Sequence, residues 1–180
     1  MSGRFIAVVG PSGVGKDSLI DALCAQASCM ARARRVITRA PEAGGEDYEA
    51  ISPALFAVRA AAGDFALHWR AHDLHYGIRV AVHQTLGGGQ DVIANLSRSV
   101  LGKADAVFED LHVLHVTAQP AVLARRLKSR GRESGGDIQR RLARKVPPLP
   151  EGLTITEIDN SGKLEEAMTA ALRALHPAKV

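Results

Sequence analysis

A glycine-rich segment near the amino terminus holds the residues best suited to chemistry. It comprises Gly10, Pro11, Ser12, Gly13, Val14, Gly15, Lys16, Asp17 and Ser18. An apolar run precedes it and apolar residues at helical spacing follow it, which is the context of a phosphate-binding P-loop. Backbone N–H groups of such a loop wrap a polyphosphate at the positive end of a helix dipole, and its lysine reaches the terminal phosphates. We therefore expect residues 10–18 to bind a nucleoside triphosphate.

Asp17 departs from the P-loop pattern. A serine or threonine usually stands there, and its hydroxyl binds Mg²⁺. A carboxylate is also a hard oxygen ligand, so Asp17 is a candidate magnesium ligand, either directly or through a bound water. Without a cation, its charge would repel the phosphates. Ser18 is the alternative source of a hydroxyl.

The basic residues are concentrated in one segment, residues 125–145. This segment holds nine arginines and lysines and two acids, whereas the rest of the chain holds 14 basic and 17 acidic residues. Arginine outnumbers lysine 17 to 6 in the whole chain, and arginine suits bidentate contacts with phosphate. The seven aromatic residues are too few for a platform that stacks nucleic-acid bases. The pattern favours a small polyphosphate ligand over nucleic acid.

Length and composition indicate one ordinary globular domain. The 180 residues are 46% hydrophobic and 23% charged, which excludes a fully disordered chain. No apolar run approaches the roughly 20 residues of a membrane helix, and no secretory leader is expected. The two cysteines, Cys24 and Cys29, offer no disulfide framework and are expected to pack as small apolar side chains. We therefore expect a cytoplasmic protein.

Apolar periodicity and turn residues predict strands that alternate with helices. The expected strands are residues 4–9, 35–38, 91–96, 111–117 and 153–158. The expected helices are residues 17–27, 53–62, 77–86, 120–130, 138–146 and 164–175. This alternation predicts a three-layer α/β domain, in which helices cover both faces of a parallel five-stranded sheet.

Five further segments carry motifs: Ile-Thr-Arg-Ala-Pro at 37–41, Gly-Glu-Asp-Tyr at 45–48, His-Tyr-Gly at 75–77, an arginine-bearing stretch at 126–142, and Ile-Asp-Asn at 158–160. With the loop, they resemble the guanylate-kinase branch of the nucleoside monophosphate kinases nearly end to end. This resemblance implies a P-loop kinase fold, an acceptor-binding insertion at about 39–86 and an arginine-rich lid at about 126–145. It also places Asn160 near the adenine of ATP.

The chain departs from the guanylate-kinase pattern at the positions that would read guanine. Glu42 stands in place of a second arginine, and Leu67 stands in place of the glutamate that contacts the base. Residues 95–98 read Asn-Leu-Ser-Arg, where acidic residues are usual. Unpaired polar groups on a buried purine cost about 1–3 kcal/mol each. Guanine recognition is therefore not expected.

The departures form a pattern of their own: Lys-Asp-Ser at 16–18, Val-Ile-Thr-Arg at 36–39, His-Trp-Arg-Ala at 68–71, Asn-Leu-Ser-Arg at 95–98, and Arg-Gly-Arg-Glu at 130–133. On these motifs the chain is similar to the ribose 1,5-bisphosphate phosphokinases of bacterial phosphonate utilisation. The resemblance implies transfer of a phosphoryl group from ATP, with Mg²⁺, to the 1-phosphate of ribose 1,5-bisphosphate. The products would be 5-phosphoribosyl 1-diphosphate and ADP.

The resemblance also implies roles for individual residues. The donor and the transferring group would be covered by four catalytic side chains, Lys16, Arg126, Arg130 and Arg141. The acceptor would be held by Arg39, Tyr48, Tyr76 and, at its second phosphate, Arg98. The implied partner is a small sugar bisphosphate, with no nucleic acid and no membrane, and a homodimer is left open. A guanylate kinase and a non-catalytic guanylate-kinase-like binding module remain the alternatives.

Other side chains give weaker signals. His72 and His75 would share a helix face as a metal pair, but they lack a third ligand, so a structural or acceptor-pocket role is favoured. His112 and His115 are expected on opposite faces of one strand. Trp69 fits either the acceptor pocket or the core.

Overall fold

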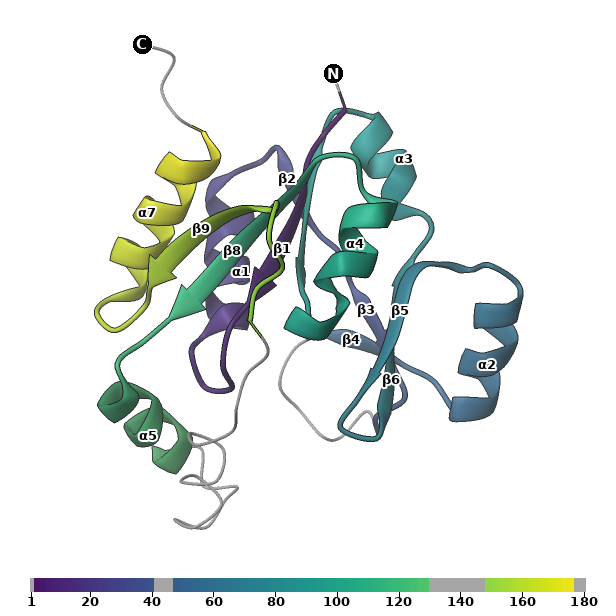
Figure 1. Ribbon diagram of the computed structural model, residues 1–180, viewed down its shortest axis with the longest axis horizontal. Coiled ribbons are helices and arrows are strands. Elements are labelled where there is room, and N and C mark those ends of the chain that lie inside the picture. Colours follow the sequence, from purple (N-terminus) through teal and green to yellow (C-terminus); the bar gives the residue numbers. More distant parts are fainter. Residues whose placement is uncertain (1, 41–46, 130–147, 177–180) are drawn as a thin grey trace.

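The computed structural model describes residues 2–40, 47–129 and 148–176. The described chain forms a five-stranded parallel sheet with a smaller four-stranded sheet beside it (Figure 1). Helices α1 (Lys16–Gln26) and α7 (Leu164–Leu175) cover one face of the larger sheet, and α4 (Leu101–Val107) lies on the other. The predicted three-layer α/β architecture is confirmed.

The larger sheet has the strand order β2-β7-β1-β8-β9. Its members are β1 (Phe5–Val9), β2 (Met30–Arg32), β7 (Asp91–Asn95), β8 (Leu111–Thr117) and β9 (Thr154–Asp159). All five residues of β1 are buried, as expected for a central strand covered on both faces. After β1 the chain forms the edge strand β2, returns to β7 between them, and then crosses to β8 on the other side of β1. The carboxyl end of β1 therefore lies at a topological switch point, where α/β proteins bind ligands.

Alternating side chains of β1 contribute to two separate cores. Ile6 and Val8 pack with buried residues of α1 and α7. Phe5, Ala7 and Val9 pack in a second core with α4 and the smaller sheet. The smaller sheet therefore lies on the α4 face of the larger sheet.

The smaller sheet has the order β4-β3-β6-β5. Its strands are β3 (Arg35–Ile37), β4 (Tyr48–Ala50), β5 (Phe65–Ala71) and β6 (Leu74–Arg79). Helix α2 (Pro53–Ala61) is capped at its amino terminus by Ser52, whose side chain accepts a hydrogen bond from the Leu55 backbone N–H, 3.2 Å away. Phe56 of α2 packs on the outer face of this sheet. The opposite face joins the core that contains β1.

The predicted strand at residues 35–38 is assigned to the wrong sheet. Those residues form β3 of the smaller sheet, and the fifth strand of the larger sheet is β2 (Met30–Arg32). Three residues show too little periodicity for the pattern to reveal a strand. These residues form a strand because they pair with β7, which lies far from them in the sequence.

The predicted helix at residues 77–86 is also wrong in its first part. Residues Leu74–Arg79 form β6, and α3 (Val82–Gly87) begins after it. β6 pairs with both β3 and β5, and Gly77 leaves room for the Phe65 ring, which lies 2.7 Å from where a Cβ would stand. Strand pairing therefore overrides the local helical spacing.

The remaining elements complete the comparison. The predicted elements at residues 111–117 and 164–175 coincide with β8 and α7, and α5 (Pro120–Ser129) matches its prediction within one residue. Strands β4 and β5, helix α4 and the short η2 (Arg98–Val100) were not predicted. The predicted helix at residues 138–146 lies outside the described residues. Among the helices that the structure describes, none has both the length and the apolar character needed to cross a membrane.

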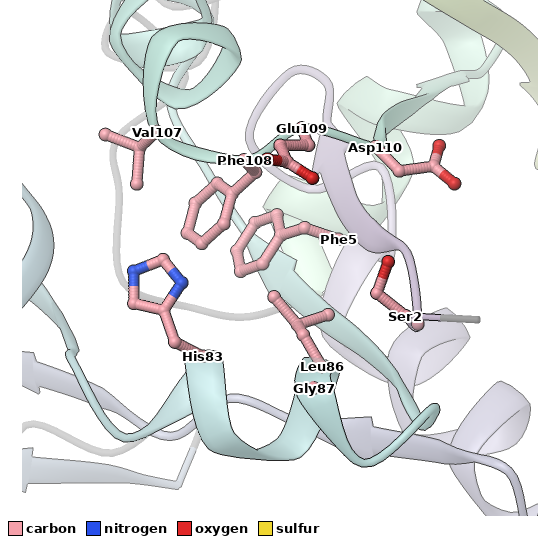
Figure 2. A pocket seen from close by; sticks show the side chains of 10 residues that line it. Ser2, Phe5, His83, Leu86, Gly87, Val107, Phe108, Glu109 and Asp110 are labelled. Atoms are coloured by element: carbon pink, nitrogen blue, oxygen red, sulfur yellow. The ribbon is translucent and has the colours of Figure 1, made fainter.

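A hollow of about 250 Å³ lies at the amino end of β1 (Figure 2). It is lined by residues that include Phe5, His83, Leu86 and Phe108. The rings of Phe5 and Phe108 stack with their centroids 3.8 Å apart. The hollow lies at the end of β1 opposite to the glycine-rich loop, so it is separate from the phosphate site described below.

Candidate phosphate-transfer site

The glycine-rich loop joins the carboxyl end of β1 to the start of α1. Gly13 and Gly15 have φ angles of 84° and 93°, in the left-handed region that favours glycine. A Cβ on Gly13 would lie 3.0 Å from the Leu127 side chain, and one on Gly15 would lie 2.7 Å from Nδ2 of Asn160. Glycine is therefore required at both positions by conformation and by packing. The result is a loop that leads into a helix amino terminus, as anion binding needs.

Lys16 bends back over this loop. Its Nζ donates hydrogen bonds to the carbonyl oxygens of Gly10 and Pro11, at 2.9 and 3.1 Å. Val14 is fully buried in the core beneath, whereas Ser12 is exposed. The loop is thus fixed from below, and the ammonium group lies at its mouth, where a polyphosphate would bind.

Two distant side chains fasten the loop from outside. The carbonyl oxygen of Val14 accepts hydrogen bonds from Asn160 Nδ2 at 2.7 Å and from Arg126 Nη1 at 3.3 Å. Asn160 follows β9, is 3% exposed, and donates its backbone N–H to the Thr117 carbonyl oxygen. Oδ1 of Asn160 is buried and has no hydrogen-bond partner among the described residues. The structure therefore brings Arg126 and Asn160 to the predicted loop from two separate elements.

Asp17 lies in the first turn of α1 at the carboxyl ends of two neighbouring strands. Its Oδ1 accepts hydrogen bonds from Asn95 Nδ2 at 3.2 Å and from Arg32 Nη2 at 3.3 Å. Arg32 also pairs with Asp21, one turn further along α1. The Asp17 side chain is 43% exposed. One accessible carboxylate beside a phosphate loop is a donor set that Mg²⁺ uses together with nucleotide phosphates.

The described residues contain no group of three or more His, Cys, Asp or Glu side chains that could hold a metal by itself. His72 and His75 do not share a helix: His72 lies in the turn between β5 and β6 with φ 50°, and His75 lies in β6. The helical metal pair considered from the sequence is therefore wrong. Any Mg²⁺ at this site would depend on Asp17 and on the phosphates of the nucleotide.

The predicted acceptor residues of the smaller sheet form two aromatic groups. The Arg39 guanidinium lies over the Tyr48 ring, 5.4 Å from its centroid, and the Tyr48 hydroxyl donates to the Ala40 carbonyl oxygen. Tyr76 stacks on Trp69, with centroids 5.3 Å apart and planes within 10°. Tyr48, Tyr76 and Trp69 are all buried in the core shared with β1. Trp69 is therefore a core aromatic that supports Tyr76.

Two further residues of the smaller sheet pack in the region of Tyr76. Arg35 is 9% exposed, donates to the Asn95 carbonyl oxygen at 3.1 Å, and places its guanidinium carbon 5.3 Å from the Tyr76 ring centroid. It links the two sheets next to the end of β7, and sequence reasoning missed it. Leu67 is buried in the same core. By the resemblance to guanylate kinases, this is the position expected for the base-reading glutamate, and the side chain there is apolar and buried.

Arg98 lies on the larger sheet, at the start of η2, and does not belong to either aromatic group. Its Nη2 forms a hydrogen bond with Nε2 of His115 at 2.5 Å. Nδ1 of His115 lies 3.4 Å from Oε2 of Glu157. Sequence reasoning placed His112 and His115 on opposite faces of one strand, and the structure agrees, since His112 bonds with Thr156 on the other side. The sequence pattern gave no sign of the contact between His115 and Arg98.

The two cysteines differ from each other. Cys24 is partly buried against the core of α1 and α7, as expected, and burial raises the pKa of its thiol. Cys29 is exposed, so its predicted packing as a small apolar side chain is wrong. Three other residues named from the sequence, Glu42, Arg130 and Arg141, lie outside the described residues.

Comparison with known proteins identifies the family. Ribose 1,5-bisphosphate phosphokinase PhnN of Ruegeria sp. (strain TM1040) is 53% identical to the chain over 170 residues, covering 94% of the chain and 90% of that protein. The protein of the same name from Agrobacterium fabrum is 46% identical over 173 residues, covering 94% of each. The chain belongs to the ribose 1,5-bisphosphate phosphokinase family. No family model matches it.

Solved structures show the fold that this phosphokinase family shares with other kinases. Guanylate kinase from Anaplasma phagocytophilum superposes with a TM-score of 0.72, at 17% sequence identity, over 97% of the chain and 85% of that structure. The chain thus has the fold of this guanylate kinase.

Proposed function

We propose that the protein transfers the γ-phosphoryl group of ATP to the 1-phosphate of ribose 1,5-bisphosphate, giving 5-phosphoribosyl 1-diphosphate and ADP. The observation that carries the proposal is the complete phosphate loop in a chain that is 53% identical to a ribose 1,5-bisphosphate phosphokinase. A binding module without catalysis would not require Lys16 at the mouth of such a loop. The intact loop therefore favours the enzyme.

The donor ATP would bind along residues 10–18, with backbone N–H groups and Lys16 on its phosphates. Arg126, which already contacts the loop, would add positive charge near the transferring group. Asn160 is supported as a nucleotide ligand by its buried Oδ1, because a hydrogen-bond donor from the nucleotide would satisfy that acceptor. Arg130 and Arg141, outside the described residues, would complete the cover over the phosphates.

Asp17 would hold Mg²⁺, directly or through a water. The donor set fits, because the carboxylate is accessible and Asn95 and Arg32 hold its Oδ1. When bound, Mg²⁺ neutralises charge on the β- and γ-phosphates. Asn95 at the end of β7 is itself uncharged, so Asp17 would supply the carboxylate beside the loop.

The acceptor would lie between the two sheets. Its attacking atom is a phosphate oxygen that is already ionised at neutral pH, so no general base is required. Catalysis then reduces to holding two anions in line and screening their repulsion. We assign this task to Arg39, Tyr48 and Tyr76 on the smaller sheet and to Arg98 on the larger one. A homodimer and a cytoplasmic location stay predictions.

An acceptor screen tests the proposal. ADP release is followed with ribose 1,5-bisphosphate or GMP as acceptor, and ³¹P NMR identifies the product. We expect turnover with ribose 1,5-bisphosphate, a new diphosphate signal, and background rates with GMP. Robust GMP turnover would establish a guanylate kinase instead. Tight ATP binding with no turnover on either acceptor or on other sugar phosphates would favour the non-catalytic module.

A further inference from the structure

Two positions of this chain differ from the usual P-loop pattern, and they differ in opposite directions. In P-loop enzymes Mg²⁺ is held by a serine or threonine of the loop and by an aspartate from a second segment. Here the loop position carries the carboxylate of Asp17. Residues 95–98, where the resemblance to guanylate kinases places acidic side chains, begin with Asn95 and contain no acid. The carboxylate therefore lies on the loop side, and a neutral side chain lies at the end of β7.

The structure brings these two positions into direct contact. Asn95 is the last residue of β7 and is in register with Val8 of β1. Val8 faces the core of α1 and α7, and register partners in a parallel pair share a face, so the Asn95 side chain points toward α1. Its Nδ2 donates a hydrogen bond to Oδ1 of Asp17, 3.2 Å away. Two residues 78 positions apart in the sequence thus form one polar pair.

The direction of this hydrogen bond defines what each side chain does. A carboxylate only accepts, so the amide of Asn95 must donate. Arg32 donates to the same oxygen at 3.3 Å, and both of these bonds leave Oδ2 of Asp17 outside them. Asp17 also lies in the first turn of α1, where the helix dipole favours a negative charge. The carboxylate is thus oriented through one oxygen and stabilised by its place on the helix.

Two further hydrogen bonds fix the backbone around Asn95. Its carbonyl oxygen accepts a bond from Nη1 of Arg35 on the smaller sheet, at 3.1 Å. The backbone N–H of Leu96, the next residue, donates to the Val8 carbonyl oxygen at 3.0 Å. The amide of Asn95 therefore starts from a fixed point between the two sheets, as a side chain that orients another one requires.

The pair contains one negative charge, and the contact distance gives the reason. Two carboxylates at hydrogen-bond distance repel each other unless a proton or a cation lies between them. An amide and a carboxylate keep their contact whether or not a cation is bound. A serine paired with an aspartate carries the same total charge, so this chain keeps the charge of the usual pair and moves it from the strand to the loop.

We infer that Asn95 is a positioning residue that orients Asp17 toward the metal of the nucleotide, and that Asp17 and Asn95 are an exchanged form of the usual hydroxyl–carboxylate pair. This inference rests on the proposed function, because Asp17 acts as a metal ligand only if the nucleotide binds with Mg²⁺. Asn95 acts through its hydrogen bond with Asp17 and does not contact the reacting atoms.

A reciprocal exchange of the two side chains tests the inference. Asp17→Asn/Asn95→Asp keeps the total charge and one amide–carboxylate hydrogen bond, but it returns the carboxylate to the strand. Calorimetric titration with ATP, in the absence of acceptor, measures the factor by which Mg²⁺ tightens ATP binding relative to EDTA. We expect Asp17→Asn alone to reduce this factor about tenfold, and the double variant to restore it to within about threefold of the wild type. A double variant as weak as Asp17→Asn overturns the inference.

Thermal unfolding gives a second test that needs neither nucleotide nor turnover. Asn95→Asp alone brings two carboxylates into contact and should lower Tm in EDTA by about 2–4 °C. Mg²⁺ should return most of this loss, because a cation between the carboxylates relieves their repulsion. Gln90→Glu adds the same charge directly before the other end of β7 and should show no such recovery. An equal response to Mg²⁺ in the two variants overturns the inference.

The inference and the proposed function fail in different experiments. Both measurements above are made without an acceptor, so they decide the relation of Asp17 to Asn95 even if ribose 1,5-bisphosphate is not a substrate. The acceptor screen decides the proposed function and does not depend on which of the two side chains carries the charge.

Discussion

The donor side and the acceptor side of the site are built in different ways. Residues 10–18 are consecutive and, in the proposed function, would bind through backbone groups, with glycines at 13 and 15, where φ is 84° and 93°. The proposed acceptor side would gather separate side chains from or near β3, β4, β6 and η2, namely Arg39 two residues after β3, Tyr48, Tyr76 and Arg98. A backbone site tolerates little change, whereas a side-chain site can change its ligand by substitution. Leu67, which is apolar and buried in the core of the smaller sheet, stands where the resemblance to guanylate kinases would place a glutamate.

The largest effect is expected on the donor side. Lys16→Ala should lower kcat/KM at least about 1,000-fold, because it removes the charge on the phosphates during transfer. The half-buried side chain fills no core position, so Tm should change by no more than a few degrees. Lys103→Ala, on an exposed position of α4, is the matched control. A wild-type rate in folded Lys16→Ala would remove Lys16 from the mechanism.

Substitution of a glycine tests whether the phosphate loop depends on its backbone conformation. Gly15→Ala should destabilise the fold by about 1–3 kcal/mol and strongly weaken ATP binding, because φ is 93° and Asn160 lies 2.7 Å from the new Cβ. Gly102→Ala in α4 has no neighbour within 4 Å of its Cβ and should be neutral or slightly stabilising. Thermal unfolding and calorimetric ATP titration measure both. Equal behaviour of the two variants would contradict the backbone account.

Asp17→Asn asks whether a side chain on the donor side binds metal. The amide keeps the size and one oxygen but loses the charge that a hard cation favours. We expect the Mg²⁺ concentration for half-maximal rate to rise about tenfold at saturating ATP. If the carboxylate has no metal role, its removal should instead tighten ATP binding and leave the Mg²⁺ dependence unchanged.

The smallest effect is expected on the acceptor side. Tyr48→Phe removes the hydroxyl that donates to the Ala40 carbonyl oxygen and should cost about 1 kcal/mol of stability. The KM for ribose 1,5-bisphosphate should rise about twofold to fivefold, because the segment after Arg39 loses its anchor, while the KM for ATP should not change. A change in the ATP KM as large as that for the acceptor would show that the two sides are not independent.

Much of the fold could be predicted because its signals are local. The loop carries a local motif, and α1, β8 and α7 each carry an apolar pattern within one segment; the structure places all four as predicted. The predictions are wrong where strand pairing, rather than the local pattern, determines the secondary structure. Residues 74–79 have a spacing compatible with a helix, but they form β6 between two partner strands. The short strand β2 is defined by β7 and has no pattern of its own.

The sequence by itself determined the phosphate loop, the α/β class and, by resemblance, the family and the expected acceptor. These properties depend on residue types at fixed spacing along one segment, which the chain carries before it folds. Only the tertiary structure decided that Asn95 and Arg32 hold Asp17, that Trp69 supports Tyr76, and that Arg98 reaches His115 across β1. Each of these contacts joins residues from different elements, and strand order and register, rather than sequence distance, bring them together.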